Sequence, residues 1–292
     1  MEPKEILARM GIPTDTADTK LTQFRSAEDG TPYEAWLVST PINGKNCVLK
    51  KAKNREAAVY TSFLSDAGDG VPRLYRHLNT LDGDYLLMEY IRGDDLYHCT
   101  REMLTAALDA LISLQNRYWN TDAPTGVGLT FEESLCARRR RGEYLCDAEL
   151  ERVYGDFLHL YERLPRTLCH DDLLPFNVLY DGTRAVLIDW ELAGLLPYPV
   201  PFARLIAHAE ESADAFFCMK DAEKEFAVSY YYEHLVRAHG ISYEDYRRTL
   251  NYFLFYEYCE WIMLGNRYAD ADMERFRLYS EKARALIARK FL

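Results

Sequence analysis

Two neighbouring segments carry the most information about the fold. They are Cys169-His170-Asp171-Asp172-Leu173-Leu174-Pro175-Phe176-Asn177 and, shortly after it, Ile188-Asp189-Trp190-Glu191. Between them lie two short apolar runs, 178–180 and 185–190, joined by the turn signal Asp181-Gly182. Short apolar runs on either side of such a dipeptide predict a β-hairpin. With a two-residue turn at Asp181-Gly182, Asn177 is expected opposite Val186 and Asp189 opposite Leu174. Both side chains would then lie at the open end of the hairpin.

The loop that carries His170, Asp171 and Asp172 leads into the same end of the hairpin. Carboxylate and amide oxygens are ligands that suit Mg²⁺, which keeps its other positions for water and phosphate. Phosphoryl transfer uses one carboxylate to orient the attacking hydroxyl, and an Asn and an Asp to hold metal on the phosphates. The alternative is a capped loop and a hairpin whose acids face water. The joint pattern favours a phosphoryl-transfer site over that alternative.

Upstream of this segment the chain has the character of an antiparallel sheet. Strands are predicted at 21–25, 33–40 and 46–52, with a hairpin turn at Asn43-Gly44 between the second and the third. Helical spacing follows at 54–64, and another strand is predicted at 82–91.

After residue 100 helices dominate, at 103–119, at 143–164 and from 202 onward. The prediction is an α+β fold of two lobes. A small antiparallel-sheet lobe over 1–92 would bind nucleotide. A larger, mainly helical lobe over 93–292 would hold the catalytic loop and bind substrate.

Composition excludes several classes of protein. Of 292 residues, 35 are Lys or Arg and 46 are Asp or Glu, which gives a net charge of −11. Nucleic-acid binders usually carry excess positive charge, so no nucleic-acid partner is expected. Hydrophobic residues at 48% are enough for a folded core and argue against disorder as the main state.

The cysteines and the N-terminus bear on location. The seven cysteines form no C-x-x-C pair and no zinc spacing, which favours thiols in a reducing cytoplasm. Residues 1–16 do not resemble a signal peptide, and no run of about 18 apolar residues predicts a membrane span. We expect a cytoplasmic protein without a membrane partner, and the sequence leaves its oligomeric state open.

Lys50 ends an apolar run on the third predicted strand, and Glu56 begins the helix after it. A Lys–Glu pair at such a place would aim an ammonium group at nucleotide phosphates. The alternative is that Lys50, Lys51 and Lys53 form a solvated strand end. Strand alternation puts Lys50 and Lys51 on opposite faces but does not choose between them.

His170-x-Asp172-x-x-x-x-Asn177, followed by Ile188-Asp189-Trp190-Glu191, closely resembles the aminoglycoside phosphotransferase and choline kinase group of protein-kinase-like enzymes. The strand ending in Lys50, the helix at 55–64 and the segment LLMEYIRGDDL (86–96) resemble the sheet lobe and hinge of the same family. The resemblance covers about residues 20–210. It implies a bilobal kinase fold, ATP or GTP as phosphate donor, Mg²⁺, and a hydroxyl group of a small molecule as acceptor.

The resemblance also implies residue roles. Asp172 is the catalytic carboxylate, and His170 supports the catalytic loop. Asn177 and Asp189 are the metal ligands. The nucleotide would be bound by Lys50 with Glu56 as its partner, by Met88 at the back of the adenine pocket, and by backbone groups of Glu89 and Ile91.

Two groups of residues could concern the acceptor. The four arginines 138–141 could bind an anion, but we favour a solvated helix face with salt bridges to Glu132, Glu133 and Glu143. Glu257, Glu260 and Trp261 lie among late tyrosines, and an acid beside aromatic rings can bind a cation. The ordinary alternative for that aromatic segment is core packing. If the functional interpretation holds, these three residues line a pocket for a cationic acceptor.

The leading hypothesis is therefore a small-molecule kinase whose acceptor is cationic or contains an amine, like an aminoglycoside or choline. A second hypothesis is a non-catalytic member of the same fold that binds a nucleotide or another ligand; no expected catalytic residue is missing to support it. A third is a His-Asp metal phosphohydrolase, suggested by His170-Asp171. That chemistry needs further His ligands, for which the sequence offers no obvious partners.

Overall fold

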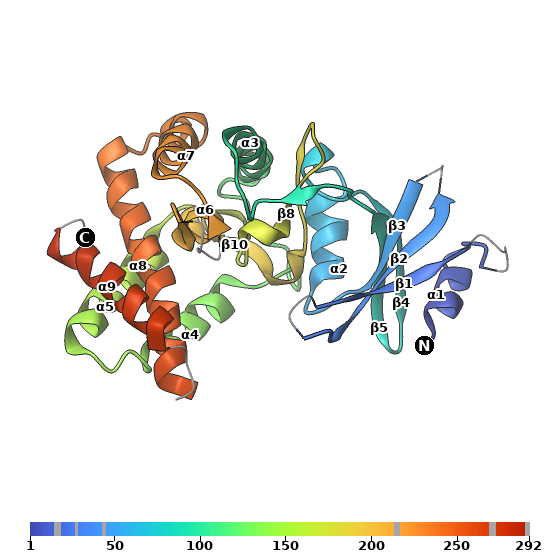
Figure 1. The fold of residues 1–292 in the computed structure, drawn as a ribbon, viewed down its shortest axis with the longest axis horizontal. Helices are drawn as coiled ribbons and strands as arrows, with labels where there is room; N and C mark the ends of the chain where they lie inside the picture. The colour runs from blue at the N-terminus through green and yellow to red at the C-terminus, as the bar shows by residue number, and fades with distance from the viewer. Residues whose placement is uncertain (15–18, 27–28, 43–44, 213–216, 269–272, 290–292) are drawn as a thin grey trace.

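The computed structural model describes residues 1–14, 19–26, 29–42, 45–212, 217–268 and 273–289 (Figure 1). Its N-terminal region holds a five-stranded antiparallel sheet in the order β1-β2-β3-β5-β4. The strands are β1 (Leu21–Arg25), β2 (Pro32–Ile42), β3 (Lys45–Lys51), β4 (Leu74–Thr80) and β5 (Gly83–Glu89). The predicted strands are confirmed, whereas β4 was not predicted. The predicted turn at Asn43-Gly44 lies outside the described residues.

Strand alternation gives the sheet two apolar faces. Cys47 and Leu49 of β3 are buried on one face, against α1 (Pro3–Arg9). Val48 and Met88 lie on the other face, in the cluster that includes α2 (Glu56–Val59) and the π-helical turn Tyr60–Leu64 that continues it. Figure 1 shows α1 and α2 on opposite sides of the sheet. Lys50 shares its face with Val48, so alternation points it toward α2.

The C-terminal region is mainly helical. Its helices are α3 (Arg101–Arg117), α4 (Phe131–Gly142), α5 (Ala148–Arg163), α6 (Pro199–Ala207), α7 (Asp221–His234), α8 (Tyr243–Tyr268) and α9 (Met273–Ala288). Short strands lie between them: β6 (Asp94–Asp95), β7 (Arg166–His170), β8 (Val178–Tyr180), β9 (Ala185–Leu187), β10 (Ala193–Pro197), β11 (Ala209–Glu210) and β12 (Phe217–Cys218). The predicted helix at 143–164 begins only at Ala148, because the Asp147 side chain caps it there.

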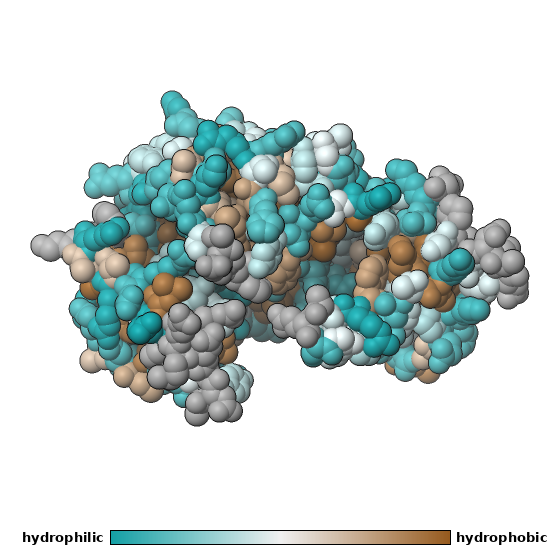
Figure 2. Space-filling view, viewed as in Figure 1, coloured by the Kyte–Doolittle hydropathy of each residue, from teal (hydrophilic) through white to brown (hydrophobic). Residues whose placement is uncertain are grey.

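The two regions share one hydrophobic core, which runs from Ala57 of α2 and Met88 of β5 through α3 to Phe253 of α8. The expected α+β architecture, with an antiparallel sheet first and helices after it, is confirmed. Because the core is continuous, a boundary between residues 92 and 93 stays a prediction. On the face drawn in Figure 2, hydrophilic residues predominate and hydrophobic ones appear in small separate groups. Within the described ranges, no helix is both long and apolar enough to cross a membrane.

Candidate active site

The hairpin forms as predicted, but its register is shifted. Val178 pairs with Leu187, and the Ile188 N–H donates to the Asn177 carbonyl, so Asn177 lies opposite Ile188 rather than Val186. The predicted turn at Asp181-Gly182 was wrong by one residue. The Asp181 carboxylate accepts from the N–H groups of Thr183 and Arg184, which makes Asp181 the first residue of the turn and puts Gly182, at φ +95°, in its centre.

Asp189 follows this hairpin in a left-handed conformation, with φ 64° and ψ 62°. A non-glycine residue there is strained and persists only where its surroundings fix it, which is common at functional sites. The next residue, Trp190, is fully buried and its indole N–H donates to the Leu187 carbonyl at 2.8 Å. This anchor holds the turn, while the Asp189 side chain remains 45% exposed.

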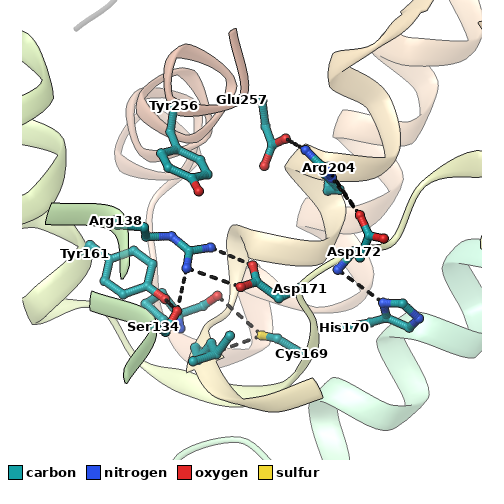
Figure 3. Close-up of polar contacts among 12 residues, drawn as sticks. Ser134, Arg138, Tyr161, Cys169, His170, Asp171, Asp172, Arg204, Tyr256 and Glu257 are labelled. Carbon is teal, nitrogen blue, oxygen red and sulfur yellow. Dashed lines mark hydrogen bonds and ion pairs between the residues drawn. The ribbon is translucent and has the colours of Figure 1, made fainter. Parts of the chain in front are cut away.

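His170 is fully buried at the end of β7. Its Nε2 lies 2.7 Å from the Ile188 carbonyl oxygen, and its Nδ1 lies 3.3 Å from the Asp172 backbone nitrogen. A carbonyl only accepts and an amide only donates, so the ring is neutral with its proton on Nε2. His170 thereby ties the Asp172 loop to the segment before Asp189 (Figure 3 draws its bond to Asp172). Both nitrogens are occupied, so this ring is not placed to bind a metal.

This arrangement makes stability depend on pH. Burial lowers the pKa of His170, outweighing the Ile188 carbonyl and the neighbouring carboxylates. Below the unfolded pKa of about 6.5 the unfolded chain takes up a proton that the folded chain refuses, so stability falls as the pH drops. His170→Gln lacks this proton uptake. As the pH drops, we expect its free energy of unfolding to fall less steeply than that of the wild type, by about 1 kcal/mol per pH unit. Urea denaturation from pH 7 to 5 measures both slopes, with the exposed His159→Gln as control. Equal slopes in wild type and His170→Gln would contradict the assignment.

Asn177 and Asp172 are joined within the loop, because Asn177 Nδ2 donates to the Asp172 carbonyl at 2.8 Å. The Asn177 Oδ1 atom accepts no hydrogen bond from the described residues. Asn177 and Asp189 both line one cleft between the sheet and the hairpin. Two hard oxygen donors on one wall of a cleft fit the coordination habit of Mg²⁺.

Lys50 lies between two carboxylates. Its Nζ is 2.8 Å from Glu56 Oε1 and 2.6 Å from Asp189 Oδ1. Burial would lower the pKa of Lys50, but Glu56 and Asp189 outweigh it and raise the pKa. Lys51, on the other face, pairs with Glu34 at 3.1 Å. Lys50 therefore pairs with Glu56, and it also contacts Asp189, which follows the hairpin.

We call the cleft around these residues the sheet-side cleft; its volume is about 470 Å³. Its walls include Val48, Lys50, Glu56, Met88, Glu89, Ile91, Leu179, Ile188 and Asp189. The Glu89 N–H is already bonded to the Arg73 carbonyl, and its carboxylate pairs with Arg184 at 2.9 Å. The Ile91 N–H has no hydrogen-bond partner among the described residues, so a ligand in the cleft could use it.

A second hollow, the helix-side cavity, has a volume of about 380 Å³. It is lined by Asp171 and Asp172 of the loop, Arg204 of α6, Arg141 and Tyr144 near the end of α4, and residues of α8 that include Tyr256, Glu257, Glu260, Arg267 and Tyr268. The predicted substrate residues Glu257 and Glu260 therefore lie at a cavity next to Asp172. Trp261 does not line it, because its ring stacks on Tyr279 with centroids 5.6 Å apart.

Arg204 links three of these carboxylates (Figure 3 draws its bonds to Asp172 and Glu257). Its Nη2 is 3.0 Å from Asp172 Oδ1, and its Nη1 is 2.7 Å from Glu257 Oε2 and 2.8 Å from Glu260 Oε2. Burial alone would raise the pKa of the Glu257 carboxyl, but Arg204 and the hydrogen bond from His208 outweigh it and lower the pKa to about 2. Arg204 thus fixes the Asp172 side chain and is also bonded to both glutamates expected to bind a cation.

Arg138 corrects another expectation, since it is not part of a solvated helix face. It is buried, and its guanidinium binds both Asp171 oxygens, at 2.5 and 3.2 Å (Figure 3). The rings of Tyr161 and Tyr256 each lie 4.8 Å from the guanidinium carbon. The other arginines of the run are exposed, but Arg139 pairs with Glu162 and Arg141 with Glu260 rather than with the predicted glutamates. The pair of Arg138 and Asp171 anchors the loop beside Asp172.

The sequence did not predict the roles of Arg204 and Arg138. Each bonds a residue more than 30 positions away. The one signal for Arg138 was its spacing of three residues from Leu135, which puts both on the buried face of α4. No sequence signal distinguished Arg204.

Comparison with known proteins defines the class. A family model described as the phosphotransferase enzyme family matches residues 45–225. This chain belongs to that family, as the motif around His170 and Asp172 predicted. No curated protein sequence shows a significant match.

Solved structures show the same fold over nearly the whole chain. The aminoglycoside phosphotransferase APH(4)-Ia, solved with AMP-PNP and hygromycin B, has a TM-score of 0.60 at 17% identity, covering 99% of this chain and 98% of that one. Choline kinase LicA from Streptococcus pneumoniae has a TM-score of 0.59 at 18% identity, covering 97% of both chains. A choline kinase from Cryptosporidium parvum has a TM-score of 0.65 at 13% identity, covering 99% of this chain and 96% of that one. The predicted kinase-like fold is confirmed.

Proposed function

We propose that this protein transfers the γ-phosphate of ATP or GTP to a hydroxyl group of a small molecule, with Mg²⁺ as cofactor. The observation that carries the proposal is the position of the Lys50 ammonium, 2.6 Å from Asp189 of the hairpin. It brings the sheet's buried lysine to the place where Asn177 and Asp189 would hold a metal. Relatives solved with AMP-PNP and with ADP support a nucleoside triphosphate donor.

The sheet-side cleft suits the nucleotide. Lys50, held by Glu56, would contact the phosphates once its bond to Asp189 is released. Met88, which is buried, would close the back of the adenine pocket, and the free Ile91 N–H would donate to the base. Because the Glu89 N–H is already used by Arg73, Glu89 would contribute its carbonyl alone.

Asn177 Oδ1 and the Asp189 carboxylate would hold Mg²⁺, which supplies charge neutralisation at the phosphates during transfer. Asp172 faces the helix-side cavity, where the acceptor would lie. Arg204 occupies its Oδ1, so the second oxygen would accept the hydrogen bond from the acceptor hydroxyl and set that oxygen in line with the phosphorus. His170 would keep Asp172 in place through the backbone.

The two alternatives have less support. The residues proposed for catalysis are all present in the sequence, so no missing residue favours a non-catalytic nucleotide-binding protein. A His-Asp phosphohydrolase would need His170 as a ligand, and both ring nitrogens are bonded within the fold. No group of three or more His, Cys, Asp or Glu side chains in the described part of the chain is arranged to hold a metal ion. The cytoplasmic location and the absence of a nucleic-acid partner stay predictions, and the oligomeric state stays open.

The neighbouring lysines provide a test. Changing Lys50 alone would leave the buried Glu56 carboxylate unpaired, so Lys50→Met is combined with Glu56→Gln. We expect this variant to bind Mg·ATP or Mg·GTP at least about tenfold more weakly, the size expected for losing one charge-assisted bond to phosphate. Lys51→Met should change the Kd less than about threefold. Lys51 also lines the cleft, but its side chain is 28% exposed and its ammonium pairs with Glu34, so its charge contributes little to phosphate binding. The Kd values are measured by calorimetric titration. Equal changes in Kd for Lys50→Met/Glu56→Gln and for Lys51→Met would contradict the proposal.

A further inference from the structure

The carboxylates of the helix-side cavity lie at its floor. The side chains of Glu257, Glu260 and Asp171 are only 5%, 14% and 15% exposed. Each carboxylate already has an arginine: Arg204 binds both glutamates, and Arg138 binds both oxygens of Asp171. Arg141 and the Tyr256 hydroxyl complete the shell of Glu260. An incoming amine would therefore find every carboxylate of the floor already bonded to an arginine, and would find Asp172 with one oxygen that Arg204 does not contact.

The side chains at the mouth of the cavity include two positively charged arginines. The Arg141 side chain is 50% exposed, and Arg267 is exposed. Arg267 forms no ion pair with the described residues. Its guanidinium carbon instead lies 5.3 Å from the centre of the Tyr144 ring and 5.1 Å from that of Tyr268. The rings that could have bound a quaternary ammonium therefore already contact an arginine.

These observations concern the cavity of the proposed function and deepen it. We infer that the acceptor carries an oxyanion, a carboxylate or a phosphate, beside the hydroxyl that receives the phosphoryl group. Arg267 would bind this oxyanion, together with the Arg141 nitrogens that are not bonded to Glu260 and Tyr256. An arginine fork matches either oxyanion with paired hydrogen bonds. The acceptor is then an anionic alcohol, not the cationic compound that Glu257, Glu260 and Trp261 suggested from the sequence.

A matched ligand series tests the inference, which rests on the proposed function. Glucosamine, glucose, glucuronate and glucose 6-phosphate share one ring frame and differ in charge and in the kind of anion. Their Kd values are measured by calorimetry on the full chain with Mg·AMP-PNP bound. We expect at least one of the two anions to bind about tenfold or more tightly than glucose, and glucosamine to bind no better than glucose. The stronger of the two anions identifies the oxyanion as carboxylate or phosphate.

Arg267→Gln should remove this anion preference. An exposed side chain that forms no ion pair with the described residues can be changed with little effect on folding. Arg140→Gln removes the same charge from an exposed position outside the cavity and should leave the preference intact. Tightest binding by glucosamine, equal affinities across the series, no measurable binding of either anion, or an unchanged preference in Arg267→Gln would overturn the inference. Failure to bind Mg·AMP-PNP in the first step would instead count against the proposed function.

Discussion

Asp172→Asn is expected to lower the turnover number about a thousandfold and to leave Mg·nucleotide affinity within about twofold of wild type. The amide keeps the shape of the side chain and can still accept from Arg204, but it no longer offers a carboxylate to the acceptor hydroxyl. Loss of a positioned general base typically costs 10² to 10⁴ in rate. The measurement is ADP release with the best acceptor of the hexose series, beside a calorimetric Kd for the nucleotide.

The control is Asp122→Asn, an exposed aspartate outside both the sheet-side cleft and the helix-side cavity. It should leave both quantities unchanged. If Asp172→Asn bound nucleotide much more weakly, or turned over at near the wild-type rate, Asp172 would not have the proposed role.

Arg138→Met is expected to destabilise the protein by about 3–5 kcal/mol, because removing one partner of a buried ion pair leaves an uncompensated charge. The partner left behind is Asp171, next to Asp172, the proposed catalytic aspartate, so activity should fall as the loop loses its anchor. Urea denaturation measures the change in the free energy of unfolding. Arg140→Met, an exposed neighbour in α4, should change stability by less than about 0.5 kcal/mol.

The double variant Arg138→Met/Asp171→Asn separates charge from packing. Removing both charges should recover most of the lost stability, because no unpaired ion remains in the core. A double variant as unstable as Arg138→Met would show that the contacts of Arg138 with Tyr161 and Tyr256, rather than its pairing with Asp171, carry the effect.

Local patterns in the sequence were enough to predict much of this architecture. Alternation placed the strand ending in Lys50 and showed that Lys50 and Lys51 face opposite ways. The spacing of His170, Asp172 and Asn177 identified the loop and the hairpin after it. Strand β4 was missed because its burial does not alternate. A helix face was expected at arginines 138–141, but the beginning of α4 at Phe131 was not predicted. The hairpin register was missed because it depends on side-chain bonds of Asp181, which a dipeptide signal does not specify.

The charge balance of the acceptor side could not be predicted in this way. From the sequence, Glu257 and Glu260 indicate a cation site, but in the fold Arg204 of α6 is bonded to both. Arg138 is predicted to be solvated, but in the fold it is buried and pairs with Asp171. Both pairings join distant segments through tertiary packing alone. A short-range pattern finds the acids and the bases of such a network, but not which of them neutralise one another.

The central claim is that Asn177 and Asp189 hold the Mg²⁺ of a bound nucleoside triphosphate. The most direct test is thermal unfolding of wild type, Asn177→Ala, Asp189→Ala and the control Asp122→Ala, each with ATP or GTP, with and without Mg²⁺. At a nucleotide concentration about 100 times Kd, binding stabilises a protein by about 2.7 kcal/mol. We predict an upward shift in Tm in wild type and the control that requires Mg²⁺, and no such shift in either site variant. No shift in wild type with either nucleotide, or a shift independent of Mg²⁺ and of both side chains, would contradict the account.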